Sequence, residues 1–233
     1  MRIFTLLPTF LLLMSSLAGQ TVRGNGKLST VTHAIDEFAG LTINGAFEVE
    51  LTQGQGYGLQ VITDENLQDF VEVEVKDGTL TIGTRQELSA PSSLKLLIRS
   101  DIFAALELNG AINLSSTTPL FGKRLTLTLN GASAVEVALA YEKVETVITG
   151  AASLVLAGEV GTISHDISGA GSIQAFDLLA DTVRVDIGGA GAAQVHARQR
   201  LQANLSGMGS ITYRGAPEVT QNISGLGSLR RVD

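Results

Sequence analysis

The second half of the chain repeats one short pattern of apolar, polar and glycine positions. Each copy has an apolar residue, a polar residue, a glycine and then small residues, as in LNGASAV at Leu129 to Val135 and ISGAGSI at Ile167 to Ile173. A repeat this regular is typical of a stacked solenoid, in which each coil buries its apolar face only against its neighbours. Seven tandem copies, 18 to 21 residues apart, carry the glycines Gly110, Gly131, Gly150, Gly169, Gly189, Gly207 and Gly225.

When the copies are aligned on these glycines, they separate into apolar and polar columns with the period of two that β-strands have. The positions six and two residues before the glycine, and four residues after it, are apolar in nearly every copy. Strands of adjacent coils lie about 4.8 Å apart, so identical apolar residues should stack on one another inside the protein. The pattern therefore predicts an all-β fold, a single-stranded β-helix (β-solenoid) with coils of about 18–21 residues.

The repeat glycine is expected to occupy a corner that needs a positive φ, which a residue with a Cβ atom reaches only at a cost. A phosphate-binding loop is the functional alternative, because Gly169-Ala170-Gly171 superficially resembles part of a nucleotide fingerprint. The recurrence of the motif and the absence of a following helix pattern argue against it. The glycines are therefore interpreted as structural.

The region at about residues 30–100 has a different texture and predicts strands joined by ordinary turns. VEVEVKDGTLTIG at Val71 to Gly83 predicts a β-hairpin with a two-residue turn at Asp77-Gly78. An outlying copy of the repeat, INGAFEV at Ile43 to Val49, places another structural glycine at Gly45. The segment between this copy and the first tandem repeat is either an excursion from the solenoid or a small sheet packed on its end.

The N-terminus has the pattern of an export signal. Arg2 precedes an apolar stretch from Ile3 to Leu13, and Ser16-Leu17-Ala18 offers small residues for cleavage. We predict a cleaved signal peptide at residues 1–19 and an exported protein in the periplasm, at the cell surface or outside the cell. An uncleaved anchor is the weaker alternative, because the apolar run is shorter than the roughly 20 residues that span a bilayer. Residues 20–233 are then one domain, with strands and the hairpin at 30–100 and the seven coils at 104–233.

Composition narrows the function classes. The formal net charge of −7 and the absence of a basic stripe argue against a nucleic-acid-binding surface. No cysteine is present, so no disulfide contributes to stability. No segment after the signal has the length and hydropathy of a membrane-spanning helix, and no motif predicts a cofactor.

The outward positions before each glycine should form a flat polar face. One of its columns contains Asp166, Asp186, Asn204 and Asn222, and the two asparagines could form a ladder of side-chain amides. Two carboxylates about 5 Å apart would repel by roughly 3 kcal/mol at an effective dielectric of 20. Arg184, a shared proton, or a divalent cation bound by Asp166 and Asp186 could offset this repulsion. These five residues are the candidate binding residues.

The three histidines do not share a metal-ligand spacing. His33 lies near the start of the mature chain, and His165 and His196 occupy different positions in their coils. His165 belongs to a column that also contains Leu106, Leu127 and Val185, so its side chain is expected to point inward.

Several motifs together resemble a known family. EFAGLTINGAFEVELTQG, then DENL at Asp64 to Leu67 and DGTLTI at Asp77 to Ile82, followed by tandem NGA, GAG and GLG units, are similar in order and spacing to the head GIN-domain family of autotransporter adhesins. The resemblance extends from about Glu37 to Leu229. It implies an exported bacterial β-solenoid of right-handed winding, in a family without established catalytic residues.

Two function classes remain open. The first is a non-catalytic surface or periplasmic module that binds a glycan or a cell-envelope protein through the polar face. The second is a polysaccharide-active enzyme of the lyase or glycosidase type that uses Asp166 and Asp186. The chain has no tryptophan and three tyrosines, so it lacks the aromatic platforms of a glycan-cleaving groove, which favours the first class. The edge of the last coil is either blunted by the charges of Arg230, Arg231 and Asp233 or buried by a partner or a second copy.

Overall fold

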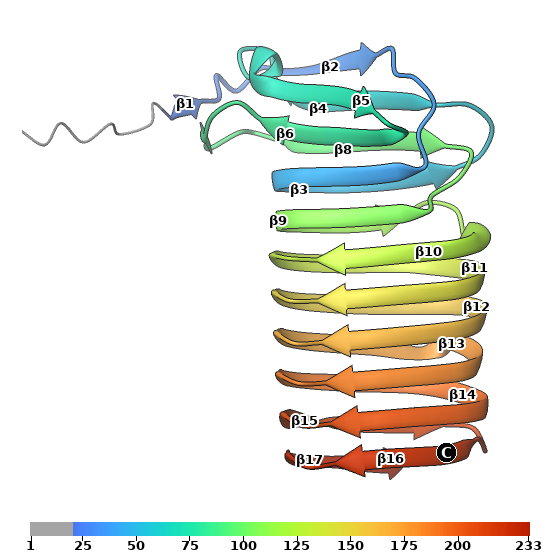
Figure 1. The fold of residues 1–233 in the computed structure, drawn as a ribbon. Helices are drawn as coiled ribbons and strands as arrows, with labels where there is room; N and C mark the ends of the chain where they lie inside the picture. The colour runs from blue at the N-terminus through green and yellow to red at the C-terminus, as the bar shows by residue number, and fades with distance from the viewer. Residues whose placement is uncertain (1–20) are drawn as a thin grey trace, which may run out of the picture.

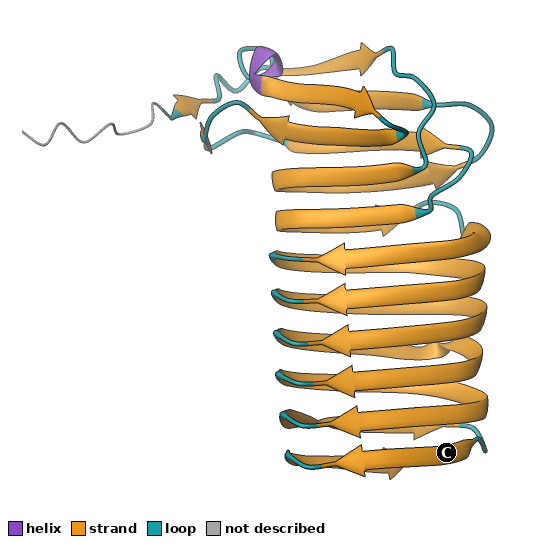
Figure 2. Ribbon diagram, viewed as in Figure 1, coloured by secondary structure: helices purple, strands orange, loops and turns teal. Residues whose placement is uncertain are grey.

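The computed structural model describes residues 21–233, and the predicted signal peptide at residues 1–19 lies outside the described residues. Strands make up most of the described chain, and the single helical element is a short 3-10 helix, η1 (Gln68–Phe70). Figure 2 shows strands stacked from one end of the molecule to the other. The all-β prediction is therefore confirmed.

The strands fall into an N-terminal group and a solenoid group. The N-terminal strands are β1 (Val22–Arg23), β2 (Leu28–His33), β3 (Gly40–Gln53), β4 (Gly58–Asp64), β5 (Val71–Lys76), β6 (Thr79–Thr84), β7 (Leu88–Ser89) and β8 (Leu94–Ser100). The solenoid strands are β9 (Ala105–Ser116), β10 (Leu120–Leu129), β11 (Ala132–Ile148), β12 (Ala151–Ile167), β13 (Ala170–Ile187), β14 (Ala190–Leu205), β15 (Met208–Arg214), β16 (Glu218–Ile223) and β17 (Leu226–Arg231).

Each coil of the solenoid contributes one strand segment to a front layer and one to a back layer. The front segment precedes the repeat glycine, the chain turns at that glycine, and the back segment follows it (Figure 1). Neighbouring coils pair in parallel and in register, so that Val144 of β11 lies beside Ile163 of β12. Figure 1 shows the coils winding right-handed along one axis. The predicted β-solenoid is confirmed.

The predicted apolar columns form the core. Val144, Ile148 and Leu154 are each fully buried, as are the equivalent residues of the adjacent coils. Burying an aliphatic side chain of this size contributes about 1.5–3 kcal/mol, so the stacked columns are the main source of stability. The columns become exposed only in the last coil, where Ile223 is 39% exposed.

The expected positive φ is found at only two of the repeat glycines, Gly45 (127°) and Gly110 (145°). For Gly131, Gly150, Gly169, Gly189, Gly207 and Gly225 the prediction is wrong, because their φ lies outside the left-handed region. The structure gives a different reason for glycine here. A Cβ atom on Gly207 would lie 2.0 Å from the carbonyl oxygen of Gly189 in the preceding coil, and the other tandem glycines are crowded in the same way. Close stacking of backbone at the corner excludes every side chain.

The N-terminal region combines the two alternatives left open by the sequence. Gly45 in β3 pairs in register with Gly110 in β9, so INGAFEV is itself a coil of the solenoid. The chain then leaves the stack and returns along the other edge of β3, where β6 pairs with its front half and β8 with its back half. The excursion therefore supplies the strands that cover this end.

The predicted hairpin is present within that excursion. β5 and β6 pair antiparallel, and the two residues between them, Asp77 and Gly78, have φ values of 50° and 73°. Two positive φ values in a two-residue loop fit the twist of the flanking strands.

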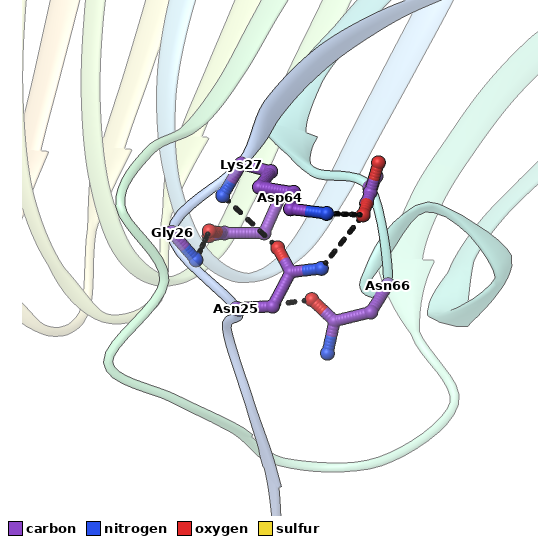
Figure 3. A network of polar contacts seen from close by, with 6 residues as sticks. Asn25, Gly26, Lys27, Asp64 and Asn66 are labelled. Atoms are coloured by element: carbon purple, nitrogen blue, oxygen red, sulfur yellow. Dashed lines mark hydrogen bonds and ion pairs between the residues drawn. The ribbon is translucent and has the colours of Figure 1, made fainter.

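A buried carboxylate fastens the first described residues to this end of the molecule. Asp64, at the end of β4, accepts hydrogen bonds from the backbone N–H of Gly26 (2.6 Å) and from the N–H and hydroxyl of Ser92 (2.7 and 2.9 Å). Figure 3 shows the surrounding contacts, in which the Asn25 N–H donates to Asn66 and the Lys27 N–H donates to the Asn25 side chain. One carboxylate thus joins two loops that lie far apart in the sequence.

Candidate functional site

The polar face consists of the outward-facing residues of the front layer between Thr126 and Ser224. Parallel pairing places Asp166 beside Asp186, Asp186 beside Asn204, and Asn204 beside Asn222. The alternation of strand residues that buries Ile167 and Ile187 turns these side chains outward. The column of candidate residues predicted from the sequence is therefore assembled in the structure.

Asp186 is the most heavily bonded residue of this column. The Arg184 guanidinium donates from Nε to Oδ2 (2.6 Å) and from Nη2 to Oδ1 (3.2 Å), which makes a bidentate ion pair on one strand. The side-chain amide of Asn204 in the next coil donates to Oδ1 at 2.6 Å. Charge-assisted hydrogen bonds of this kind are short and directional. Of the three ways to offset the Asp166–Asp186 repulsion, the structure contains the arginine.

Asp166 and Asp186 both border a shallow depression in the polar face. Its volume is about 240 Å³, and Asn204, Asn222 and the serine hydroxyls of the neighbouring corner also line it. Asp166 is exposed there, whereas the side chain of Asp186 is 27% exposed. The depression therefore combines a free carboxylate, a carboxylate already paired with a cation, and neutral hydrogen-bonding groups.

A divalent cation at this acidic pair stays a prediction. No group of three or more histidine, aspartate or glutamate side chains within residues 21–233 has the arrangement of a metal site. Both oxygens of Asp186 already accept hydrogen bonds from Arg184. A cation bound by Asp166 and Asp186 would therefore compete with the guanidinium for the same oxygens.

The amide ladder expected at Asn204 and Asn222 is not formed, and a ladder lies elsewhere on the same face. In the described structure the amide of Asn204 donates to the Asp186 carboxylate, a stronger acceptor than a neutral amide. A ladder of hydrogen bonds instead joins the residues that directly precede the repeat glycine in the first coils, which are three asparagines and one threonine. Asn109 donates to Asn44 at 3.0 Å, Asn130 donates to Asn109 at 2.8 Å, and the Thr149 hydroxyl donates to Asn130 at 2.8 Å.

These four residues were missed as a group, although the sequence contains the signal. The asparagine stands immediately before the glycine in INGA, LNGA and LNGA, so any stacking of the glycines in register must also stack the asparagines. The ladder extends the polar face toward the N-terminal end of the solenoid. The ladder presents side-chain amides to a ligand, whereas the depression presents carboxylates.

His165 lies behind the polar face, as its column predicts. Its side chain is fully buried, and Nδ1 lies 2.7 Å from the hydroxyl oxygen of Thr146 in the preceding coil. Burial lowers the pKa of His165 to about 4 because the interior disfavours the charged imidazolium. A neutral histidine inside the sheet cannot exchange protons with a ligand on the outer face.

The back layer presents a different outer surface. Its strands place exposed alanines after the repeat glycines of the central coils, at Ala132, Ala151, Ala170 and Ala190, with small residues two positions further along. This surface carries little charge over the central coils. Nearer the N-terminal end it has a depression of about 350 Å³, lined by Glu48, Asn113 and Glu136 among others. Over the central coils, the charged and amide groups that could orient a polar ligand lie on the polar face.

Within residues 21–233, no helix has both the length and the apolar character needed to cross a membrane. None of the curated proteins compared with the chain matches it.

Solved bacterial structures share the fold over most of the chain. A putative adhesin from Bacteroides fragilis has a TM-score of 0.87 and 23% sequence identity, with 91% of this chain and 100% of that chain covered. A putative lipid binding protein from Parabacteroides distasonis has a TM-score of 0.75 and 24% identity over 92% of this chain and 100% of its own. A putative adhesin from the same organism has a TM-score of 0.71 and 25% identity, covering 91% of this chain and 100% of its own.

The sequence itself agrees with a family model over most of its length. The model described as "Putative auto-transporter adhesin, head GIN domain" matches residues 37–217, which include the first coil at Gly45, the excursion and all but the last coil of the solenoid. The resemblance expected from the motifs is thereby confirmed, and the chain belongs to the head GIN domain family.

Proposed function

We propose that this protein is a non-catalytic, exported, adhesin-like module that binds a glycan through its polar face. The observation that carries the proposal is the arrangement around Asp186, where Arg184 and Asn204 fix a carboxylate at the rim of an open depression. Glycan hydroxyl groups both donate and accept hydrogen bonds, so they suit a surface on which carboxylates and amides are held in place. The family and the adhesin names of two structural relatives support a role in attachment.

The same geometry disfavours the polysaccharide-active enzyme. A glycosidase needs one carboxyl group that delivers a proton and a second that remains ionised across the scissile bond. Asp186 is committed to a bidentate ion pair with Arg184, which occupies both of its oxygens. The nearest histidine in the sequence, His165, is buried on the opposite side of the sheet. Asp166 is left without an acid–base partner on this face, so binding is better supported than turnover.

Export is part of the proposal, because an adhesin acts outside the cytoplasm. The apolar N-terminal segment predicts export, and the family name is consistent with it. The compartment, whether periplasm, cell surface or medium, follows from fractionating cells that produce the full chain and locating the protein with an antibody.

A glycan array probed with residues 21–233 tests the binding proposal. We expect retention on a subset of glycans, and Asp186→Asn and Asn204→Ala should each weaken solution binding to the best glycan by about tenfold or more. Gln194→Ala, an exposed change on the back layer, is the matched control and should bind as the parent does. Unchanged thermal unfolding temperatures would show that the variants remain folded.

Three results would overturn the proposal. Retention that survives both polar-face variants would place the site elsewhere, and a complete lack of retention would reject glycans as the ligand class. Release of reducing ends from any retained polysaccharide, abolished by Asp166→Asn, would replace binding with catalysis.

A further inference from the structure

The C-terminal end of the solenoid has two strand edges with no neighbour among the described residues. β16 pairs only with β14, and β17 pairs only with β15. At the other end of the solenoid, by contrast, β6 and β8 cover both halves of β3. An uncovered edge presents unpaired N–H and C=O groups, which favour pairing with another strand.

The same end exposes apolar side chains that are buried in every preceding coil. Ile223 is 39% exposed, whereas the equivalent Leu205 in the coil before it is 1% exposed. Val219 and Leu229 are also only partly buried, whereas their counterparts Leu201 and Ile211 in the coil before are each 1% exposed. The interior columns therefore end in an open apolar cross-section, and a second layer of strands placed on it would remove this area from water.

The backbone groups of the two edges point away from the solenoid at matching positions. The Ser224 N–H donates inward to Leu205 O (2.9 Å), and the Leu226 N–H donates inward to Gly207 O (3.0 Å). Successive residues of a strand direct their N–H and C=O groups to opposite sides. The free groups are therefore those of Val219, Gln221 and Ile223 on β16 and of Gly227, Leu229 and Arg231 on β17.

We infer that this end pairs with the same end of a second copy of the chain, related by a two-fold axis. Gln221 lies four residues before the corner glycine Gly225, and Leu229 lies four residues after it, so they occupy matching places in the front and back layers. One axis perpendicular to the layers can thus pass beside both residues. It pairs β16 with β16 of the second copy and β17 with β17, both antiparallel.

In this register Gln221 and Leu229 each lie opposite themselves, and each can exchange two backbone hydrogen bonds with its copy because their free groups point outward. On the front layer Val219 comes to lie opposite Ile223, so apolar inward positions meet apolar ones. On the back layer Ser228 comes to lie opposite Arg230, and Gly227 opposite Arg231. An axis beside Val219 and Arg231 would instead oppose two guanidinium groups, so charge favours the register centred on Gln221 and Leu229 over that one.

The pairing has a consequence for the proposed attachment role, although it does not rest on it. A two-fold axis perpendicular to the layers leaves the polar faces of both copies on the same side of the assembly. Two depressions would then face one surface, and a second contact with that surface would form at high effective concentration.

Cysteine cross-linking tests the register, since the chain contains no cysteine. Gln221 is exposed, and in the pair its two copies lie within the Cα separation of about 4.4–6.8 Å that a disulfide spans. We expect Gln221→Cys in residues 21–233 to form a disulfide-linked dimer under mild oxidation. Gln202→Cys, the exposed position just after the buried Leu201 in the preceding coil, is the control and should remain monomeric.

Mass and shape in solution provide the second measurement. Sedimentation equilibrium of the parent chain should give twice the monomer mass at micromolar concentration, and small-angle scattering should show a particle of about twice the monomer length. Gln221→Lys places two ammonium groups opposite each other and should shift the dissociation constant upward by tenfold or more with an unchanged unfolding temperature. A parent chain that is monomeric at 100 micromolar, a side-by-side dimer, or a dimer insensitive to Gln221→Lys would overturn the inference.

Discussion

The Thr146 hydroxyl oxygen and Nδ1 of His165 lie 2.7 Å apart inside the solenoid, on neighbouring strands of the front layer. Both side chains occupy a column that also contains the buried residues Leu106, Leu127, Val185 and Ala203 and ends at Gln221 in the last coil. This pair is the buried polar part of the column, and its imidazole Nε2 has no hydrogen-bond partner among the described residues. A buried, partly satisfied imidazole makes folding sensitive to acid.

The free energy of unfolding should fall as the pH is lowered from about 6.5 to about 4. The pKa of His165 is about 4 in the folded protein and near 6.5 when unfolded, so in this range the unfolded chain binds a proton that the folded chain does not. The loss approaches about 3 kcal/mol at the acid end of the range. Urea unfolding of the parent and of Thr146→Val/His165→Val at pH 7.5, 6 and 5 isolates this contribution. Identical pH dependence in the two proteins would contradict it.

A methyl group at a corner glycine should destabilise the solenoid. Gly207→Ala would bring Cβ to 2.0 Å from the carbonyl oxygen of Gly189, so backbone must move, at an expected cost of about 3 kcal/mol. Gly188→Ala is the matched control, because its Cβ meets only the Ser206 hydroxyl at 3.9 Å. Thermal unfolding of both variants checks the prediction. A large loss in both, or in neither, would show that corner packing is not the reason for glycine.

Removing Arg184 should expose the repulsion between the two stacked aspartates. Arg184→Ala leaves Asp186 beside Asp166 with only the Asn204 amide as a partner, and we expect a loss of about 1 kcal/mol that shrinks as salt is added. In Arg184→Ala, calcium at millimolar concentration should raise the unfolding temperature more than in the parent. Asp166→Asn in the same background should restore most of the stability. If it does not, the two carboxylates do not interact.

Asn130 holds the centre of the amide ladder and should contribute to the stability of the first coils. Asn130→Ala removes its bond to Asn109 and leaves the Thr149 hydroxyl without its acceptor. The ladder is exposed, so we expect a modest loss of about 1 kcal/mol. Hydrogen exchange should show faster opening in β10 and β11 than in β14. Equal exchange rates in β10, β11 and β14 of the variant would show that the ladder does not stabilise the first coils.

Loss of the Asp64 carboxylate should release the first described strands. The Ser92 backbone N–H and hydroxyl, with the Gly26 N–H, hold the pKa of Asp64 below its ordinary value despite its burial. The carboxylate therefore stabilises the fold at neutral pH, and this contribution is lost as the pH falls through the folded pKa. Asp64→Ala should lower the unfolding temperature and make the segment around Gly26 sensitive to protease. Asp69→Ala, a change in the nearby 3-10 helix, serves as the control.

Most of the fold could be predicted from the repeat period, because a regular spacing of identical residues forces the coils into register. Once Gly150 stacks on Gly131, the inward and outward columns follow from the period of two, including the burial of His165. The reason for the glycines did not follow from the sequence. Both a positive φ and a close backbone contact demand glycine. The φ values and the 2.0 Å separation that a Cβ atom on Gly207 would have from the Gly189 carbonyl oxygen distinguish them.

The sequence predicted which residues of the candidate site lie side by side in one column. It did not predict which of them are joined by hydrogen bonds. Stacking places Asn204 next to both Asp186 and Asn222, and the choice between them depends on which acceptor is stronger. The excursion between β3 and β9 was beyond the repeat pattern altogether, because its strands pair with β3 across long sequence separations. Only the Asp77-Gly78 turn gave a local signal there.

The stacking of coils between the corner glycines also determines how the molecule would respond to a pulling force. The described chain enters the solenoid near one end and leaves it at the other, and each coil is bonded only to the coils beside it (Figure 1). Tension between the two ends would therefore detach the coils one after another, starting at the uncovered edge. Each step would release one repeat, or about 65 Å of extended chain, so the protein would lengthen in even increments while the remaining coils kept their faces intact.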